Sequence, residues 1–291
     1  MSAKEIDLRP IERSEADACV REWHYSGKPY VKSRLHMGVF YRGRLMGALQ
    51  WGPSIDTRKM LYVVPGTRWD GYLELNRMAL SDALPRFSES RSIAVALRLI
   101  KRHASHIEWI VSYSDATQCG DGAIYRAAGM ELTQVRSNTT LWLAPDGRIV
   151  SDVGIRTSER LRRQYGCGTS AREFAAAGLV RLRGYQIRYM KFLQRGARER
   201  YAGEILPFSD IPDDARMVRG VRSSRQLDLA SATVPPSQDV RSDPAAPYIP
   251  HQARTAWQSW ESALAALPDG EMRPDPSCEG EPDTAQIAMG F

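Results

Sequence analysis

The chain has 291 residues, of which 43% are hydrophobic, and it carries 40 Lys and Arg against 34 Asp and Glu. This length allows one large domain or two small ones, and the hydrophobic content is sufficient for a packed core. No apolar run approaches the ~18 residues of a membrane helix, and the polar amino terminus does not resemble a signal peptide. Because the four cysteines have no paired spacing, we expect a soluble protein of the reducing cytoplasm, with no metal knuckle and no disulfide framework.

The charge is unevenly distributed along the chain. Residues 1–205 contain 33 Lys and Arg against 21 Asp and Glu, whereas residues 206–291 contain 7 against 13. Of the 17 prolines, 11 lie in residues 206–291, together with many Ser and Asp. Such a composition rarely buries enough apolar surface to fold. We therefore expect residues 206–291 to form an acidic, disordered tail, with one isolated helix over residues 251–267.

The first half of the chain alternates between strand and helix patterns. Residues 6–11 read as a short strand, and the acidic segment that begins at Ser14 starts a helix. Residues 35–41 and 45–51 flank a glycine turn, which is the pattern of a hairpin.

Residues 71–80 alternate as the next strand. The alternation predicts one face formed by Leu73, Leu75, Arg77 and Ala79, and it places Glu74 on the other face. Arg77 would then be either a buried arginine paired with an acid or a group that faces an anion on the substrate or donor. The sequence leaves both interpretations open.

From Ser92 the apolar spacing becomes helical, with a stripe typical of an amphipathic helix. A strand over residues 108–113 and a short helix over 121–128 follow, and then strands near 131–136 and 139–144 that a turn would join. This order predicts an α+β fold, a mixed sheet with flanking helices. We expect residues 1–149 to form the catalytic domain.

Residues 150–205 are predicted to be a second, smaller unit with two short helices and two strands over 179–183 and 185–193. Its segment 156–200 carries twelve Lys and Arg against three acids, with tyrosines interleaved. A solvated surface usually mixes its charges more evenly, so this excess favours a basic extension that binds DNA phosphates. The predicted contacts are Arg160, Arg162, Arg163, Arg172, Arg181, Arg183, Arg188 and Lys191.

Two polar pairs lie far apart in the sequence. His24 and Tyr25 end the first helix, whereas Asp115 and Tyr125 follow the strand over residues 108–113. Nitrogen and oxygen donors of this kind suit iron or manganese, and they can also move a proton. Each also has an ordinary interpretation, since His24 can be a surface histidine, Asp115 a helix cap and Tyr125 a core tyrosine.

Three serines, Ser88, Ser90 and Ser92, lie at the start of the amphipathic helix. Their hydroxyls and the helix dipole predict a phosphate or cofactor contact. Capping of the helix by one of them is an equally good interpretation.

The order of elements up to residue 145 resembles the GCN5-related N-acetyltransferase fold, although the turn Arg86 to Ile93 has none of the glycines that cradle coenzyme A there. A closer resemblance covers roughly residues 15–200 and is to the Mom family of phage DNA-modification proteins. Its motifs are similar, in order, to Glu22-Trp-His-Tyr25, Glu74-Leu-Asn-Arg77, Phe87-Ser-Glu-Ser-Arg-Ser92, Ser112-Tyr-Ser-Asp115 and Gly122-Ala-Ile-Tyr125.

This resemblance implies an enzyme that converts N6 of adenine in DNA to a carbamoylmethyl (acetamido-type) adduct and so protects phage DNA from host restriction. It implies iron, an acyl-CoA or glycine-derived donor, double-stranded DNA as partner and the host cytoplasm as location. The oligomeric state stays open, a homodimer included. By position, the implied catalytic residues are Tyr25, Arg77, Asp115 and Tyr125, with Ser90 also matched, and the implied metal ligands are His24, Tyr25, Asp115 and Tyr125.

Two other functions stay open. One is an acyl-CoA-dependent N-acyltransferase that acts on a small amine or a protein, and the other is a non-catalytic DNA-binding protein. If the substrate is an adenine inside a duplex, that base must be extruded, and aromatic rings near the site would offset its lost stacking. Tyr25, Trp51, Trp69 and Tyr72 are candidates, although core packing is an ordinary role for each.

Overall fold

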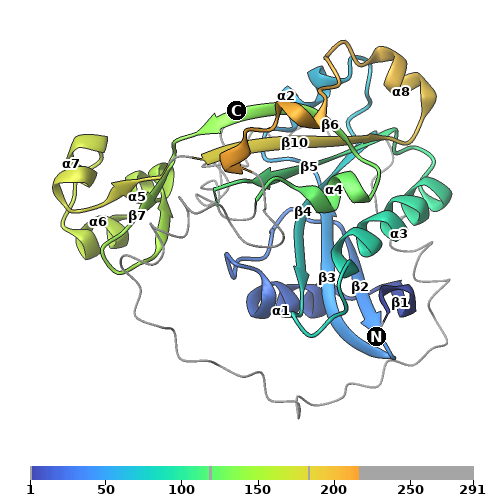
Figure 1. Ribbon diagram of the computed structural model, residues 1–291, viewed down its shortest axis with the longest axis horizontal. Coiled ribbons are helices and arrows are strands. Elements are labelled where there is room, and N and C mark those ends of the chain that lie inside the picture. The colour runs from blue at the N-terminus through green and yellow to red at the C-terminus, as the bar shows by residue number, and fades with distance from the viewer. Residues whose placement is uncertain (1, 118–119, 183, 216–291) are drawn as a thin grey trace.

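A seven-stranded mixed sheet forms the centre of the protein (Figure 1). The computed structural model describes residues 2–117, 120–182 and 184–215. In spatial order the strands are β1 (Ile6–Pro10), β2 (Leu35–Tyr41), β3 (Arg44–Gly52), β4 (Tyr72–Leu80), β5 (Trp109–Asp115), β10 (Gly184–Phe192) and β6 (Glu131–Asn138). Every neighbouring pair is antiparallel except β4 and β5, which are parallel. The predicted α+β class with a mixed sheet is confirmed.

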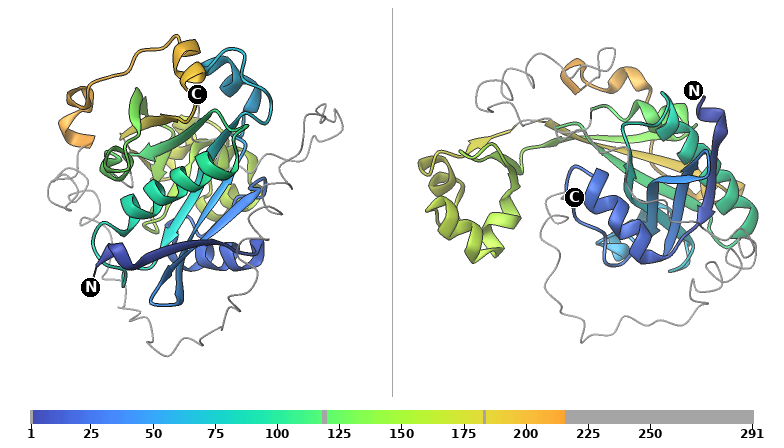
Figure 2. Two further views of the ribbon diagram at one scale, coloured as in Figure 1. Left: turned by 90° about the vertical axis from the view of Figure 1, so that its right-hand side faces the viewer. Right: turned by 90° about the horizontal axis from the view of Figure 1, so that it is seen from below.

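Helices cover both faces of this sheet (Figures 1 and 2). The long helix α3 (Ser88–His103) and the short α4 (Ala123–Ala127) lie on one face, where they bury the largest apolar core. On the other face α1 (Arg13–Trp23) packs on β2 to β4, and α2 (Thr57–Val63) and α8 (Arg195–Arg200) pack near β5 and β10. None of the helices that the structure describes has both the length and the hydropathy of a membrane span.

The apolar stripe predicted from Ser92 onward is confirmed in α3. Ile93, Ala96, Leu97 and Ile100 are all buried against the sheet. Burial of each larger side chain stabilises the fold by about 1.5–3 kcal/mol relative to its exposure. Three basic residues in the last turn suit the negative end of the helix dipole.

A β-bulge in β4 reverses the predicted face of Arg77. The register with β3 shifts by one residue, because Gln50 pairs with Arg77 whereas Trp51 pairs with Leu75. Asn76 is thus the extra residue, and it breaks the alternation of the strand. Leu75 packs into the α3-side core, while Arg77 lies on the α1 side beside Gln50, which hydrogen-bonds to α1. The prediction of one shared face for both residues is wrong.

A smaller unit is inserted between β6 and β10 and lies to one side of the main sheet (Figures 1 and 2). It contains a three-stranded sheet and three short helices, with a core around Trp142, Ile155 and Phe174. A capping box of Ser170 and Glu173 starts α7. The elements are β7 (Leu141–Leu143), β8 (Ile149–Ser151), β9 (Val180–Arg181), α5 (Asp152–Thr157), α6 (Glu159–Tyr165) and α7 (Ala171–Ala176).

The predicted extension 150–205 therefore divides between two parts of the structure. Its residues 184–192 form β10, which lies between β5 and β6 of the main sheet. The hairpin predicted for residues 35–41 and 45–51 is confirmed, since β2 pairs with β3. The predicted pairing of residues 131–136 with 139–144 does not form, because β6 pairs with β10, and β7 pairs with β8 and β9. β10 buries Ile187 and Tyr189 on one face and Met190 on the other, which requires a central position in a sheet.

Residues 206–215 are ordered, contrary to the prediction that disorder begins at residue 206. The Leu206 N–H donates to the Leu132 carbonyl, and Phe208 and Ile211 pack on the α3-side core. Two 3₁₀ turns, η2 (Phe208–Asp210) and η3 (Asp213–Ala215), follow this contact, and a third, η1 (Ala3–Glu5), precedes β1. The remainder of the predicted tail, including the helix expected over 251–267, lies outside the described residues.

Substitution of Gly122, which precedes α4, tests how tightly that helix packs on the sheet. Its φ is +74°, and a Cβ atom there would lie 2.6 Å from the Tyr189 ring. Gly43 has a similar φ of +79° with nothing within 4 Å. We expect Gly43→Ala to destabilise the fold by about 1 kcal/mol, and Gly122→Ala to add about 1–3 kcal/mol from overpacking. Equal losses in denaturant unfolding would contradict this packing.

Candidate functional site

The main sheet opens between its two parallel strands. β4 and β5 form only three residue pairs, which end at Glu74 and Val111. Beyond them the strands continue to Leu80 and Asp115 without pairing to each other. Ligands in open sheets commonly bind at the carboxyl ends of parallel strands. We call this opening the fork, formed by residues 75–80 and 112–115.

Arg77 is held at the fork by backbone oxygens. Its Nε donates to the Lys28 carbonyl at 2.9 Å, and its Nη1 donates to the Asn76 carbonyl at 2.7 Å. The guanidinium also lies 5.9 Å from the centroid of the Tyr30 ring. With 4% of its surface exposed, Arg77 is a largely buried cation. It is anchored to the loop that follows α1.

His24 lies next to this cation. Burial, followed by the charge of Arg77, lowers the pKa of His24 to about 3, so the imidazole is neutral at physiological pH. Its Nδ1 accepts the Ser26 N–H at 3.1 Å and lies 2.8 Å from the Ser26 hydroxyl. The Tyr25 ring stacks on the imidazole with 4.3 Å between centroids, and 54% of Tyr25 is exposed. The structure thus brings His24, Tyr25 and Arg77 together.

Glu74 is a carboxylate at the base of the fork that the sequence reasoning missed. Burial raises its pKa above the usual range, while the nearby Ser54 hydroxyl, the Asn76 amide and the charge of Arg77 oppose the rise. Neither Ser54 Oγ nor Asn76 Oδ1, however, forms a hydrogen bond of good geometry with another described residue. Buried polar atoms of this kind usually bind water or a ligand. Two polar atoms beside Glu74 can therefore bind a water molecule or a ligand.

Tyr113 lies on the same side of β5. Burial raises the pKa of its phenol, and the negative charge of Glu74 adds to this rise. Its hydroxyl contacts the Met60 sulfur at 3.3 Å, and Arg188 faces it from β10. The only signal for Glu74 and Tyr113 in the sequence was their presence inside the Glu74–Arg77 and Ser112–Asp115 motifs.

Asp115 and Tyr125 approach the fork from different directions. Asp115 ends β5 on the side of Tyr113, and its Oδ1 accepts the Thr117 N–H at 3.0 Å. Tyr125 belongs to the α3-side core, and its hydroxyl donates to the Tyr113 carbonyl at 3.4 Å. Both residues thus lie at the end of β5, but their side chains come from opposite faces of the sheet.

The fork fits the implied iron only in part. The neutral imidazole of His24 has the protonation state of a metal ligand, but the neighbouring charge of Arg77 opposes a second cation. The Tyr125 phenol donates its proton to a carbonyl, which is not the bonding of a phenolate ligand. Within the described ranges, no three His, Cys, Asp or Glu side chains gather as a metal site. Iron therefore stays an expectation from the resemblance.

The three serines at the start of α3 do not form one exposed hydroxyl cluster. Phe87 caps the helix in the left-handed region at φ 70° and provides no side-chain hydrogen bond. Ser88 is buried and donates to the Pro85 carbonyl, while Ser90 donates to the Phe87 carbonyl at 3.2 Å. Ser92 is fully buried in the core. Of the three, Ser90 is the most accessible to a phosphate.

Five of the predicted DNA contacts lie on the inserted unit. Arg160 and Arg172 are exposed, and their side chains make no hydrogen bond or ion pair with another described residue. Arg163 pairs with a glutamate of its own helix. Arg162 donates to carbonyls at the end of α5, and Arg181 stacks over Trp142 at 4.7 Å.

The other predicted DNA contacts have different positions. Arg188 faces Tyr113 on β10 and bonds through Nε to Thr133 Oγ1 at 3.0 Å, so it belongs to the fork side of the main sheet. Lys191 donates to the Gly129 carbonyl at 2.8 Å, next to α4. Arg183 lies outside the described residues. The basic segment is therefore not one continuous surface.

The chain matches the model of the Mom protein family over residues 5–210. It belongs to the Mom protein family. It is also 32% identical over 211 residues to the methylcarbamoylase Mom of Escherichia phage Mu, across 72% of this chain and 85% of that protein. The resemblance inferred from the sequence motifs is thus confirmed.

Solved structures with a related arrangement are acetyltransferases. One is a GNAT family acetyltransferase from Elizabethkingia anophelis with acetyl-CoA bound, 10% identical, covering 65% of this chain and 98% of that chain at a TM-score of 0.35. Another is a Bacillus subtilis acetyltransferase in complex with CoA, 11% identical, covering 65% and 97% at a TM-score of 0.37. Both TM-scores are low, so the fold of this Mom family member rests on its own sheet topology.

Four motifs of this Mom family member meet at the fork. Residues 22–25 end α1 beside Arg77, residues 74–77 form the bulged part of β4, and residues 112–115 end β5. Residues 122–125 begin α4, whose Tyr125 reaches the carbonyl of Tyr113. Segments that are distant in sequence thus surround one opening, which is the arrangement expected of a functional site.

The low pKa of His24 can be measured by NMR titration of its imidazole. Between about pH 8 and about pH 5 we expect no titration of His24, whereas an unperturbed histidine titrates near ~6.5. Arg77→Met should raise the His24 pKa, because it removes the neighbouring cation. Arg98→Met, which removes an exposed arginine of α3, should leave it unchanged. A wild-type His24 that titrates near ~6.5 would contradict this geometry.

Proposed function

We propose that this chain is a DNA-modifying transferase that places a carbamoylmethyl group on N6 of adenine in phage DNA, in the host cytoplasm, and so protects that DNA from restriction. Membership of the Mom family supports the assignment, as does the similarity to a protein named methylcarbamoylase. The structural observation that carries the proposal is the fork, where Glu74 lies beside the buried Arg77 and beside two polar atoms that have no hydrogen-bond partner among the described residues.

The exocyclic amine of adenine is a poor nucleophile and needs to lose a proton as it reacts. In the proposed step, a bond forms between N6 and the methylene carbon of the donor while the bond from that carbon to its leaving group breaks. The N6 proton passes to a carboxylate, and the leaving group departs with the electron pair. The donor is any molecule that carries an activated carbamoylmethyl group, such as a glycine-derived one.

Glu74 is the carboxylate best suited to accept this proton. A raised pKa makes a carboxylate a stronger base and brings it closer to the operating pH. Asp115 instead holds the Thr117 N–H and closes the turn after β5, which suits a positioning role. Arg77, whose charge faces the fork, would stabilise negative charge that develops on the leaving group.

The inserted unit would hold the DNA. Arg160 and Arg172 are exposed and unpaired within the described part of the chain, so phosphates can bind there without breaking an existing ion pair. Arg163 and Arg181, which have weak surface partners, would add to this contact. Arg162 is bonded to backbone oxygens and is better explained as a structural residue.

Nucleoside mass spectrometry on plasmid DNA from expressing cells tests the proposed function. We expect a modified deoxyadenosine that is absent without the protein. A carbamoylmethyl adduct and a methylcarbamoyl adduct are isomers, so the nucleoside should also be hydrolysed in acid. The first gives carboxymethyladenine, whereas the second gives adenine and methylamine. Unmodified deoxyadenosine from cells that contain soluble protein and iron would refute the proposal.

Substitution of the two carboxylates tests which one accepts the proton. Glu74→Gln should lower the modification rate by about 10²–10⁴-fold, the usual contribution of a general base. Asp115→Asn keeps an oxygen for the Thr117 N–H and should lower it less. Glu204→Gln, a change at an exposed glutamate, is the control and should have no effect. A larger loss in Asp115→Asn than in Glu74→Gln would assign the proton to Asp115.

The pKa of Glu74 also predicts a stability effect. A carboxyl whose folded pKa is raised contributes stability below its unfolded pKa of ~4.3, and this contribution is lost as the pH rises through the folded value. At neutral pH, Glu74→Gln should therefore melt at or above the wild-type temperature, and the difference should shrink toward acid. A clear destabilisation at neutral pH would mean that ionised Glu74 stabilises the fold.

A further inference from the structure

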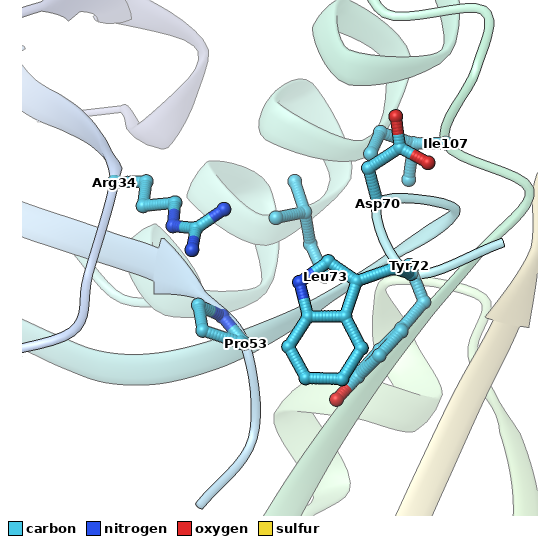
Figure 3. Close-up of a pocket in the computed structure, with 7 residues that line it drawn as sticks. Arg34, Pro53, Asp70, Tyr72, Leu73 and Ile107 are labelled. Carbon is cyan, nitrogen blue, oxygen red and sulfur yellow. The ribbon is translucent and has the colours of Figure 1, made fainter. Parts of the chain in front are cut away.

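A second polar and aromatic pocket lies where β2, β4 and β5 begin and β3 ends (Figure 3). Its empty space is about 320 Å³ when open solvent is included, and only a small part of this space is enclosed. None of its lining residues belongs to the predicted catalytic or metal set. They are Arg34, Pro53, Trp69, Asp70, Tyr72, Leu73 and Ile107. We call it the Arg34–Trp69 pocket.

Arg34 supplies the pocket with a cation. Its side chain is half-buried and makes no hydrogen bond, ion pair or ring contact with another residue in the described ranges. Figure 3 shows its guanidinium extended toward Leu73, with Asp70 on the far side of the pocket. Asp70 is already paired with Arg68 at 3.2 Å. A half-buried guanidinium of this kind is suited to a ligand with hydrogen-bond acceptors.

Apolar and aromatic side chains form most of the remaining lining. Trp69 is 37% exposed, which leaves part of its indole available for stacking. Pro53, Leu73 and Ile107 provide the other apolar surfaces. A small anion such as phosphate gains nothing from such walls, whereas a planar aromatic ring with acceptor atoms at one edge uses both the indole and the guanidinium.

The pocket is connected to the fork through Tyr72 and Pro53. Tyr72 lines the pocket, and its hydroxyl accepts the N–H of Ser54, the residue whose side chain lies beside Glu74. The Pro53 carbonyl accepts hydrogen bonds from the Tyr30 hydroxyl and from the Asn76 amide. Tyr30 and Asn76 also contact Arg77. A ligand in the pocket would thus lie next to the groups that hold the proposed catalytic residues.

We propose that the Arg34–Trp69 pocket binds one unstacked nucleobase of the DNA substrate. The base stacks on Trp69, and its ring nitrogen or carbonyl accepts hydrogen bonds from Arg34. This inference rests on the proposed function, since it is DNA that supplies the base. The pocket holds a base outside the helical stack, and the gain from Trp69 offsets part of the energy lost when that base leaves its neighbours.

Fluorescence titration with 2-aminopurine deoxyriboside monophosphate tests the pocket. This base analogue is excited at wavelengths that tryptophan does not absorb, and its emission falls when it stacks on an aromatic ring. The full-length wild type should quench it saturably. Trp69→Ala and Arg34→Met should each raise the apparent Kd by about tenfold or more, which is the range for loss of one base–aromatic stack.

Two matched variants show whether the loss is specific. Trp69→Phe keeps a ring at the pocket and should retain part of the quenching, while Arg98→Met removes an exposed arginine of α3 and should leave Kd unchanged. Thermal melting verifies that each variant is folded. Equal quenching by wild type and Trp69→Ala, or no saturable quenching by wild type, would overturn the proposal.

The titration measures binding alone and not the modification reaction. A negative result for the pocket can therefore be distinguished from a negative result for the proposed function. Saturable binding of the 2-aminopurine nucleotide without any modified deoxyadenosine in cells would refute the modification proposal alone. Modified DNA in cells together with quenching that does not change on substitution of Trp69 or Arg34 would refute the pocket proposal alone.

Discussion

The early separation of β4 from β5 is the constraint on which the rest of the structure depends. Two parallel strands that pair over three residues leave the facing backbone groups of the following residues without a strand partner. The chain closes around this opening from both faces. On one face the loop after α1 is tied to β4 by the bond from Arg77 to Lys28, and on the other α4 reaches the carbonyl of Tyr113 through Tyr125. The opening is thus braced on both faces.

Burial is the main influence on the protonation states at the opening, and the charge of Arg77 is a second one. Arg77 opposes the protonation of His24 and at the same time favours the ionised form of Glu74. At His24, burial and the charge of Arg77 both lower the pKa, so the imidazole stays neutral. At Glu74, burial raises the pKa, the charge of Arg77 lowers it, and the effect of burial is larger. Burial, with the charge of Arg77 as a smaller influence, thus leaves a neutral imidazole and a carboxyl with a raised pKa side by side, and acid–base chemistry uses groups with such different protonation states.

Local patterns predicted local elements well, and non-local pairing poorly. The stripe of α3 and the capping box at Ser170 follow from spacing within one segment, and the structure contains both. The bulge at Asn76 has no local signal, because its cause is the register with β3. The position of β10 depends on which strands leave an edge free, so the sequence predicts a strand over residues 185–193 without identifying its partners. For the same reason the motifs pointed to the fork, whereas Glu74 emerged as its base only from the fold.

The path of the chain links the inserted unit to the fork. β10 contributes Arg188 to the side of Tyr113, and the insertion lies between β6 and β10. The basic segment read from composition thus combines cations of two kinds: Arg160 and Arg172, which are exposed on the insertion, and Arg188, which faces the fork. Under the proposed function the first kind binds phosphates and supplies affinity that falls with salt, while the second lies beside Tyr113 at the fork. Because β10 joins both parts, a duplex held by the insertion lies on a unit that is fixed to the sheet at both ends.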